Sequence, residues 1–298
     1  MSHSLLTALK PSYFFAPKNL MRRLWAKFSP QAAPRQNVRL PWGAELEVDI
    51  HDTIGGAIYR QGIFDIGVSE CAWRLLRPSD QVVDAGANIG YMTSVFAAKI
   101  GSGGNVHSFE PHPVIREKLA ANVARFGKNF AAVTIHGVAL GDADGTADLV
   151  EADAFTTNQG TAFLADDNTP GNVKRHQVAV KRLDEIFPTE KFGLIKIDVE
   201  GHEAKLIKGA ENIFKTRRAR NVIYEDHELG QSGLPEMFEQ HGYKVFAVGH
   251  DFWGLRLTDY RKKIVLDTSW ESPSYLATID PEGVQRAIGR GWKIFKGV

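Results

Sequence analysis

The sequence predicts an α/β fold in which an open sheet binds a nucleotide-type ligand at its strand ends. The first observation is the segment 82–91, where a buried strand breaks at Asp84, small residues follow, and a helical pattern opens at Tyr91. The second is a strand pattern at 106–109 that ends in Glu110. A strand, a glycine turn and a helix place free backbone N–H groups beside a ligand, and an acid after the second strand is where a ribose finds partners for its hydroxyls.

Composition indicates a globular protein with one sizeable core. The chain has 298 residues, of which 43% are hydrophobic and 24% charged, and this balance is typical of globular domains. The net charge of +1 gives no reason to expect a nucleic-acid partner. Cys71 is the single cysteine, so no internal disulfide forms, and we expect a reducing, cytoplasmic compartment. The sequence gives no signal for an oligomeric state.

Residues 1–36 form a basic arm that carries six Lys or Arg residues and no acid. No apolar run in it approaches the roughly 18 residues of a membrane span, and its apolar groups are too broken for a signal peptide. The segment 17–28 has the pattern of a short amphipathic helix. We expect the arm to pack on its own domain, and the alternative is a peripheral contact with anionic lipid.

The rest of the chain alternates between strand and helix patterns. Residues 37–79 form an extension with a period-two strand pattern at 38–50 and helices at 53–60 and 69–76. Residues 80–250 contain the ligand-binding domain, and residues 251–298 form a C-terminal extension. Within the domain, helices are predicted at 91–100, 113–126, 203–209 and 234–241, and strands at 133–140, 146–150, 177–180, 194–199, 221–224 and 243–248. A polar loop at 152–174 is expected to cover a site.

Acidic residues follow the strands in register. They are Asp84, Glu110, Asp142, Asp198, Glu200 and Glu225. The ligand crevice of an open α/β sheet lies at the carboxyl ends of its strands, so these acids are predicted to converge there. Lys196, Asp198 and Glu200 alternate along one strand face, which requires that the charges pair or meet a ligand. The alternative is an exposed edge strand with a salt bridge.

Other conspicuous residues receive structural interpretations. His227 is taken as a loop histidine. Trp253 is expected in the core, although an exposed ring there would suit stacking on a sugar. No close-spaced set of histidines or cysteines indicates a metal site, and carboxylates such as Asp198, Glu225 and Asp226 need not hold Mg²⁺.

The glycine turn argues against a dinucleotide. In a G-x-G-x-x-G fingerprint that begins at Gly86, the second glycine is replaced by Asn88 and the third by Tyr91. Those glycines let the backbone approach a pyrophosphate and the helix pack closely on the strand. A nicotinamide-dependent oxidoreductase is therefore disfavoured. The pattern D-x-G-x-x-x-G instead resembles the first motif of S-adenosylmethionine-dependent methyltransferases.

Four motifs in order, at 84–91, 109–113, 138–142 and 195–201, together resemble the FkbM family of S-adenosylmethionine-dependent methyltransferases. The resemblance runs from about residue 38 to about residue 228. It implies a doubly wound, Rossmann-like methyltransferase sheet with helices on both faces and an antiparallel last strand. It also implies S-adenosylmethionine as cofactor and methyl transfer to a hydroxyl of a small-molecule or glycan substrate, on a sugar or a secondary metabolite. A ligand-binding module without turnover is the alternative.

The resemblance also assigns site residues. The implied cofactor contacts are Asp84, Gly86, Ala87, Asn88, Gly90, Tyr91, Glu110 and Asp142. The predicted catalytic residues are Asp198 or Glu200 as the base and Lys196 as the group that keeps Asp198 ionised. His227 or Glu225 is the next candidate base. The alternative is that Lys196, Asp198 and Glu200 form a structural charge cluster.

Overall fold

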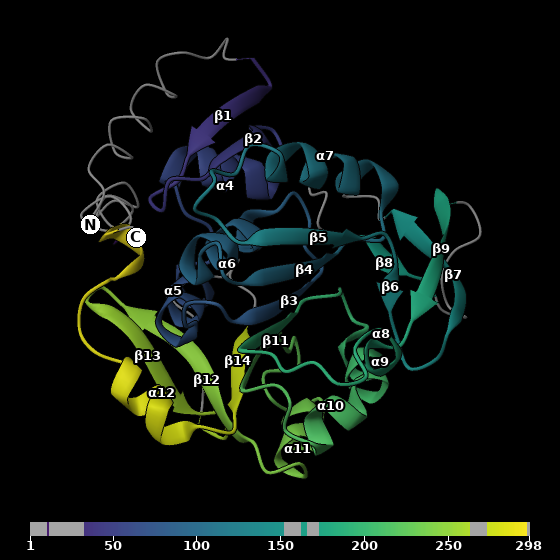
Figure 1. The fold of residues 1–298 in the computed structure, drawn as a ribbon, viewed down its shortest axis with the longest axis vertical. Coiled ribbons are helices and arrows are strands. Elements are labelled where there is room, and N and C mark those ends of the chain that lie inside the picture. The colour runs from purple at the N-terminus through teal and green to yellow at the C-terminus, as the bar shows by residue number, and fades with distance from the viewer. Residues whose placement is uncertain (1–10, 12–32, 152–161, 166–172, 263–272, 297–298) are drawn as a thin grey trace.

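A large central sheet with helices on both faces organises the chain (Figure 1). The computed structural model describes residues 11, 33–151, 162–165, 173–262 and 273–296. Within these residues the central sheet has eight strands in the order β13-β12-β14-β11-β10-β3-β4-β5. In chain order they are β3 (Gln81–Ala85), β4 (Asn105–Phe109), β5 (Ala132–His136), β10 (Leu194–Ile197), β11 (Asn221–Glu225), β12 (Lys244–Asp251), β13 (Gly254–Asp259) and β14 (Ser274–Thr278).

The strand order confirms the predicted doubly wound sheet. The chain moves outward from β3 to β4 and β5, then returns to the other side of β3 to form β10 and β11, and all five strands are parallel. The last strand, β14, is antiparallel to both β11 and β12, as the resemblance implied. The direction of winding therefore reverses between β3 and β10, which is where an open α/β sheet has its ligand crevice.

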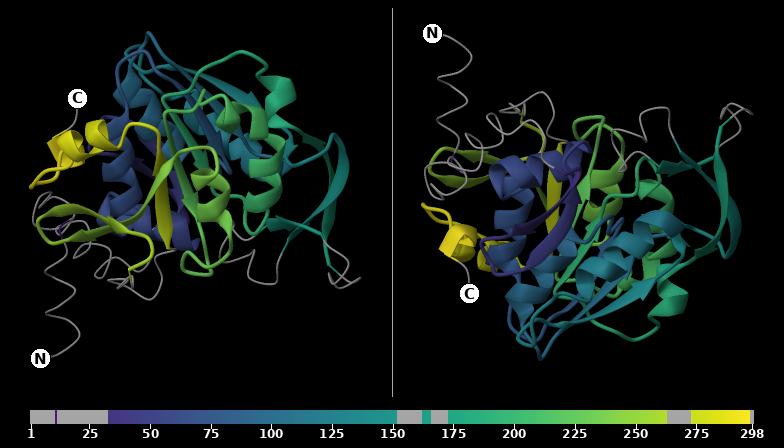
Figure 2. Two further views of the ribbon diagram at one scale, coloured as in Figure 1. Left: turned by 90° about the horizontal axis from the view of Figure 1, so that it is seen from below. Right: turned by 90° about the horizontal axis from the view of Figure 1, so that it is seen from above.

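Each face of the sheet buries its own hydrophobic core. On β3, Val82 belongs to one core and Val83 to the other, because successive side chains of a strand point to opposite faces. The first core is covered by α5 (Ile66–Leu75) and α6 (Tyr91–Ile100). The second is covered by α8 (Leu183–Ile186), α9 (Glu203–Gly209), α10 (Glu211–Lys215) and α11 (Leu234–Glu239). Figure 2 shows the blue and green helices on opposite sides of the strands.

The N-terminal extension packs over the start of the domain. Its predicted strand pattern is a hairpin of β1 (Arg35–Arg39) and β2 (Glu45–Asp49), followed by α4 (Thr53–Gln61). Asn122, near the end of α7 (Pro113–Val123), joins this hairpin to the glycine turn. Its side chain accepts a hydrogen bond from the N–H of Glu47 at 2.8 Å and donates to the carbonyl of Ile89 at 2.8 Å. The extension is thus connected to the glycine turn through the side chain of Asn122.

A second, smaller sheet corrects one prediction. In the described residues it has four strands in the order β6-β9-β7-β8, namely β6 (Ala139–Leu140), β7 (Gly145–Glu151), β8 (Ala162–Leu164) and β9 (Arg175–Lys181). The strand predicted at 133–140 was wrong as a single element, since its first part is β5 of the central sheet and its end is β6 of the small one. The two parts separate at 137–138 because β5 pairs with β4, whereas β6 pairs with β9.

The C-terminal residues complete the central sheet and its cover. Strands β13 and β14 belong to the same sheet as β12, so the sheet continues past residue 250. Helix α12 (Pro281–Ala287) and a short 3-10 helix η2 (Ile294–Lys296) follow, and both contact α5. The core position expected for Trp253 is wrong: the residue is 60% exposed, because it lies in the tight turn between β12 and β13.

The predictions for the N-terminal arm concern residues that the structure describes only in part. The amphipathic pattern at 17–28 lies outside the described residues, and among the arm's described residues Arg35 and Gln36 belong to a strand, β1. In the ranges given above, no helix combines the length and apolar character that crossing a bilayer requires.

Candidate active site

A pocket opens at the carboxyl ends of β3, β4, β10 and β11, where the winding of the sheet reverses. Its empty space, which includes open solvent at the mouth, is about 1260 Å³. Residues 162–164, which form strand β8 within the predicted loop at 152–174, line it as well. Its floor includes the apolar residues Phe109, Leu140 and Ile197.

The glycine turn between β3 and α6 forms one wall. Gly86 has φ +78°, and a Cβ there would lie 1.8 Å from the carbonyl oxygen of Asp198, so only glycine lets β3 and the segment after β10 approach this closely. Gly90 has φ +93° at the start of α6. Ala87, Asn88 and Tyr91 also line the pocket, whereas Gly90 is not among the described residues that do. The Tyr91 hydroxyl accepts from the N–H of Phe64 at 3.0 Å.

Glu110 is fixed at the end of β4 by two backbone bonds. One carboxylate oxygen accepts from the N–H of Asn88 at 2.9 Å and the other accepts from the N–H of His112 at 2.9 Å. Burial raises the pKa of Glu110 to about 7. A carboxylate has about four lone-pair positions, so each oxygen keeps room for one further donor. The residue is therefore oriented to accept a pair of neighbouring hydroxyls.

Asp84 lies beneath the turn and is not among the described residues that line the pocket. It is fully buried on β3, where it accepts from the Thr93 hydroxyl at 2.6 Å. Its other oxygen is 3.8 Å from the Lys196 ammonium. Burial raises the pKa of Asp84, although the charge of Lys196 opposes that shift. Asp84 thus joins β3, α6 and β10 and positions the turn from below.

Lys196 and Asp198 form an ion pair at the end of β10. The ammonium lies 2.8 Å from the Asp198 carboxylate, whose side chain is 29% exposed. Burial alone would lower the pKa of Lys196, but Asp198 and Asp84 together raise it, so the lysine stays charged. The predicted pairing of Lys196 with Asp198 is confirmed. The strand itself ends at Ile197, one residue before Asp198.

Two further carboxyl groups face the pocket beside this pair. Glu200 stands at the mouth with φ +53°. Burial of its carboxyl group and the nearby charges of Asp198 and Glu203 raise its pKa to about 7, although the residue as a whole is exposed. Burial and the charge of Asp198 also raise the pKa of Glu225, at the end of β11. His227 is exposed and lies 3.6 Å from Glu225, which fits a loop histidine.

Asp142 departs from the prediction. It is exposed, and the lining of the pocket in the described part of the chain ends at Leu140 on this side. The reason is the small sheet: β6 pairs with β9, and Gly141 packs so closely on α9 that a Cβ at Gly209 would lie 1.9 Å from the Gly141 carbonyl oxygen. The chain then turns away from the crevice before Asp142.

One pocket carboxylate was missed. Asp65 precedes α5 with φ +41°, accepts from the N–H of Val68 at 3.1 Å, and lines the pocket opposite β11. An acid directly before an apolar helix is a recognisable N-cap. Nothing local, however, shows that this cap faces the sheet ends. With Asp65, the described lining has five carboxylates and, in Lys196, a single Lys or Arg residue.

Comparison with known proteins decides the family. The sequence model of the methyltransferase FkbM domain matches residues 84–245, more than half of the chain. The chain belongs to the FkbM methyltransferase family. It is therefore an S-adenosylmethionine-dependent methyltransferase, and the match begins at Asp84 and ends within β12.

Three relatives show how far the likeness extends. The 31-O-demethyl-FK506 methyltransferase FkbM of Streptomyces tacrolimicus is 29% identical over 246 residues, which cover 71% of this chain and 90% of that protein. The hexuronic acid methyltransferase AglP of Haloferax volcanii is 28% identical over 148 residues, or 50% of this chain and 56% of AglP. The AMB antimetabolite synthetase AmbE of Pseudomonas aeruginosa is 24% identical over 212 residues, covering 57% of this chain but only a tenth (10%) of that protein.

The pocket of this FkbM-family chain suits S-adenosylmethionine. Glu110 offers lone pairs to ribose hydroxyls, and the turn at Gly86 and Asn88 brings bare backbone close to the ligand. The lining has five carboxyl groups and a single lysine among the described residues, and this excess of acidic groups suits a ligand that carries a sulfonium and an ammonium group. The groups that would hold the cofactor are thus Glu110 and the turn, with Asp84 as their support.

Proposed function

We propose that this methyltransferase acts on a hydroxyl oxygen of a sugar or a secondary metabolite. The observation that carries the proposal is that the carboxyl groups of Glu200 and Glu225 line the pocket just after β10 and at the end of β11, beside the Lys196–Asp198 ion pair. A hydroxyl is a weak nucleophile and needs a base to accept its proton. The pocket offers several carboxyl groups that could serve as this base. The names of two relatives support parts of this proposal: a 31-O-demethyl-FK506 methyltransferase supports an oxygen acceptor, and a hexuronic acid methyltransferase supports a sugar-type acceptor.

Glu200 is the strongest candidate base. A general base works best with a pKa near the operating pH, and the pKa of Glu200 is raised to about 7. Asp198 is held by Lys196 at 2.8 Å, so its geometry suits it better to orient the acceptor hydroxyl. Glu225 lies across the same end of the pocket and would accept a hydrogen bond from a second hydroxyl of a sugar-like acceptor.

In the proposed reaction, a methyl group passes from the cofactor to the acceptor oxygen and a proton passes to Glu200. When bound, the cofactor supplies an electrophilic methyl group on a positively charged sulfur. The acceptor oxygen forms the new C–O bond as the C–S bond breaks, the electron pair of that bond stays on sulfur, and the hydroxyl proton passes to Glu200. Positioning of the oxygen in line with the C–S bond supplies much of the rate, and the base adds about 10²–10⁴-fold.

Labelled-product mass spectrometry tests the proposal. The purified chain is incubated with methyl-labelled S-adenosylmethionine and with glycan and small-molecule extracts, and fragmentation locates the label. We expect an O-methyl ether, and we expect Glu200→Gln to form it much more slowly while binding the cofactor normally. Label found only on nitrogen, carbon or sulfur would refute the acceptor class.

A further inference from the structure

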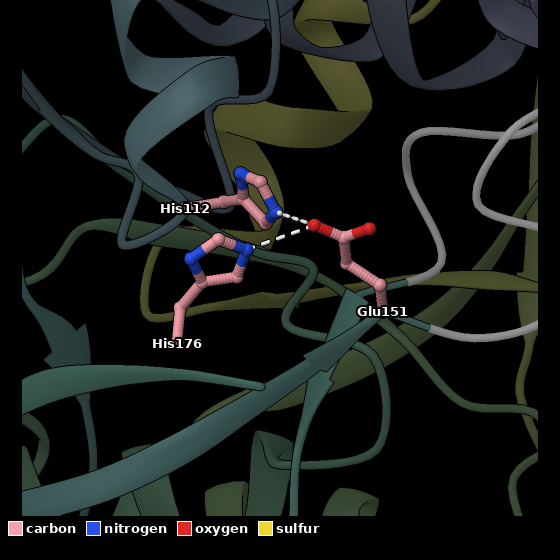
Figure 3. Close-up of side chains that lie close together, drawn as sticks. All are labelled: His112, Glu151 and His176. Carbon is pink, nitrogen blue, oxygen red and sulfur yellow. Dashed lines mark hydrogen bonds and ion pairs between the residues drawn. The ribbon is translucent and has the colours of Figure 1, made fainter. Parts of the chain in front are cut away.

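Two imidazoles and a carboxylate from distant parts of the chain meet beside the cofactor pocket (Figure 3). His112 precedes α7, Glu151 ends β7, and His176 lies on β9. The Nε2 atoms of both histidines point at the same oxygen of Glu151, at 3.2 Å from His112 and 2.8 Å from His176. All three potential ligand atoms lie within 4.8 Å of one another.

From this geometry we propose a binding site for a divalent cation of the zinc class, with His112, Glu151 and His176 as its ligands. Zn²⁺ binds imidazole nitrogen and carboxylate oxygen at about 2.0–2.2 Å, and two histidines with one glutamate are an established ligand set. Ligands at such distances stand roughly 3.3 Å apart in a tetrahedron and roughly 2.9 Å apart in an octahedron. The observed separations of 3.2 and 2.8 Å fall close to these values. A fourth position is left for water.

The surroundings of the cluster suit an ion that holds two parts of the fold together. The side chains of His112, Glu151 and His176 are 1%, 13% and 20% exposed, so the cluster is shielded but reachable. The site would join the small sheet, through β7 and β9, to the turn between β4 and α7. The N–H of His112 donates to Glu110, so an ion at His112 would also stiffen that wall of the pocket. This last link rests on the cofactor role proposed for Glu110.

Two interactions compete with the ion and make the proposal testable. The Lys174 ammonium lies 2.6 Å from the same Glu151 oxygen, but its side chain is 63% exposed and can swing into solvent. The Nδ1 atom of His112 accepts a long contact of 3.5 Å from the N–H of Ile115. Ligation through Nε2 requires the proton on Nδ1 and therefore gives up that contact. Removal of the lysine charge should accordingly favour the ion.

Calorimetry on the full chain, freed of metal with a chelator and without cofactor, tests the site. We expect one equivalent of Zn²⁺ to bind in the micromolar range or tighter, and Co²⁺ to give the visible absorption of a low-coordinate site. Loss of a group that merely orients a ligand typically costs 10–100-fold in metal affinity. His176→Gln and Glu151→Gln, which remove ligands, should therefore weaken binding by at least about a hundred-fold.

Two further variants sharpen the result. Lys174→Met should tighten Zn²⁺ binding, which a purely structural ion pair would not do. His51→Ala, at an exposed histidine on another part of the surface, should change nothing. Circular dichroism confirms that each variant is folded. Absence of Zn²⁺ binding by the wild-type chain, or binding that survives both ligand substitutions, would overturn the site without bearing on methyl transfer. A cofactor titration with and without Zn²⁺ then tests the link through Glu110 separately.

Discussion

Replacement of Glu110 by alanine is the most direct test of how the pocket binds its cofactor. The carboxylate is already fixed by the N–H groups of Asn88 and His112 at 2.9 Å each, so its remaining lone pairs are aimed without further ordering. Hydrogen bonds to a charged group contribute roughly 1.5–3 kcal/mol. Every 1.4 kcal/mol is a factor of ten in affinity, so Glu110→Ala should weaken S-adenosylmethionine binding about ten- to a hundred-fold.

The same contacts predict that glutamine is a poor substitute. Both oxygens of Glu110 accept backbone N–H groups, so an amide NH₂ at either position would face a donor. An unpaired buried donor costs about 1–3 kcal/mol. Glu110→Gln should therefore lose thermal stability as well as cofactor affinity, despite its matching shape.

Isothermal calorimetry and thermal unfolding measure the two effects on the same samples. Glu117→Ala, on the exposed side of α7, is the matched control and should leave both quantities unchanged. The reasoning fails if Glu110→Ala binds S-adenosylmethionine as tightly as the wild type does.

Four other expectations follow from the same site and from the N-terminal arm. Cofactor affinity should fall by up to about tenfold per pH unit below pH 7, because the pKa of Glu110 is about 7 and ribose hydroxyls pair with its ionised form. The dependence of affinity on pH, measured by calorimetry, should be weaker in Glu110→Gln. Gly86→Ala should abolish cofactor binding in that assay, since its Cβ would lie 1.8 Å from a carbonyl oxygen, and normal affinity would contradict the geometry. At least one of Asp198→Asn and Glu200→Gln should lower kcat about a hundred-fold or more with near-normal cofactor affinity, and wild-type turnover by both would move the base to Glu225. If residues 1–36 contact anionic lipid, their deletion should abolish liposome pelleting at low salt, and pelleting of the full chain should fade as salt rises; a full chain that never pellets leaves only a packing role.

The sheet and the core of the site were predictable because their signals are local. The turn at 86–90 places glycines between an apolar strand pattern and an apolar helix pattern, and each of these features is visible in the sequence. The pairing of Lys196 with Asp198 was also predictable, since residues two apart on a strand share a face. Charges on an otherwise buried strand must find partners.

The remaining site residues depend on contacts that no local pattern records. The segment 133–140 reads as one strand, and only its pairing with β4 and with β9 shows that it divides between two sheets and carries Asp142 away from the crevice. Asp65 is a recognisable helix cap, but its place in the pocket depends on how α5 crosses the sheet. The three residues of the proposed zinc site lie 39 and 25 positions apart, so close spacing could not reveal them.

The topology also separates the two tasks of the pocket. β3 lies between β4, which carries Glu110, and β10, which leads to Asp198 and Glu200. The cofactor contact proposed for Glu110 therefore lies on one side of the glycine turn and the proposed proton acceptor on the other. The two sides still meet through Asp84 and Lys196, since Asp84 is buried under the turn at 3.8 Å from the same ammonium that holds Asp198 at 2.8 Å. Loss of the Lys196 charge would leave Asp84 buried without a counter-charge. Substitution of Lys196 should consequently weaken both cofactor binding and turnover. Substitution of Glu110 should affect mainly cofactor binding, and substitution of Glu200 should affect mainly turnover.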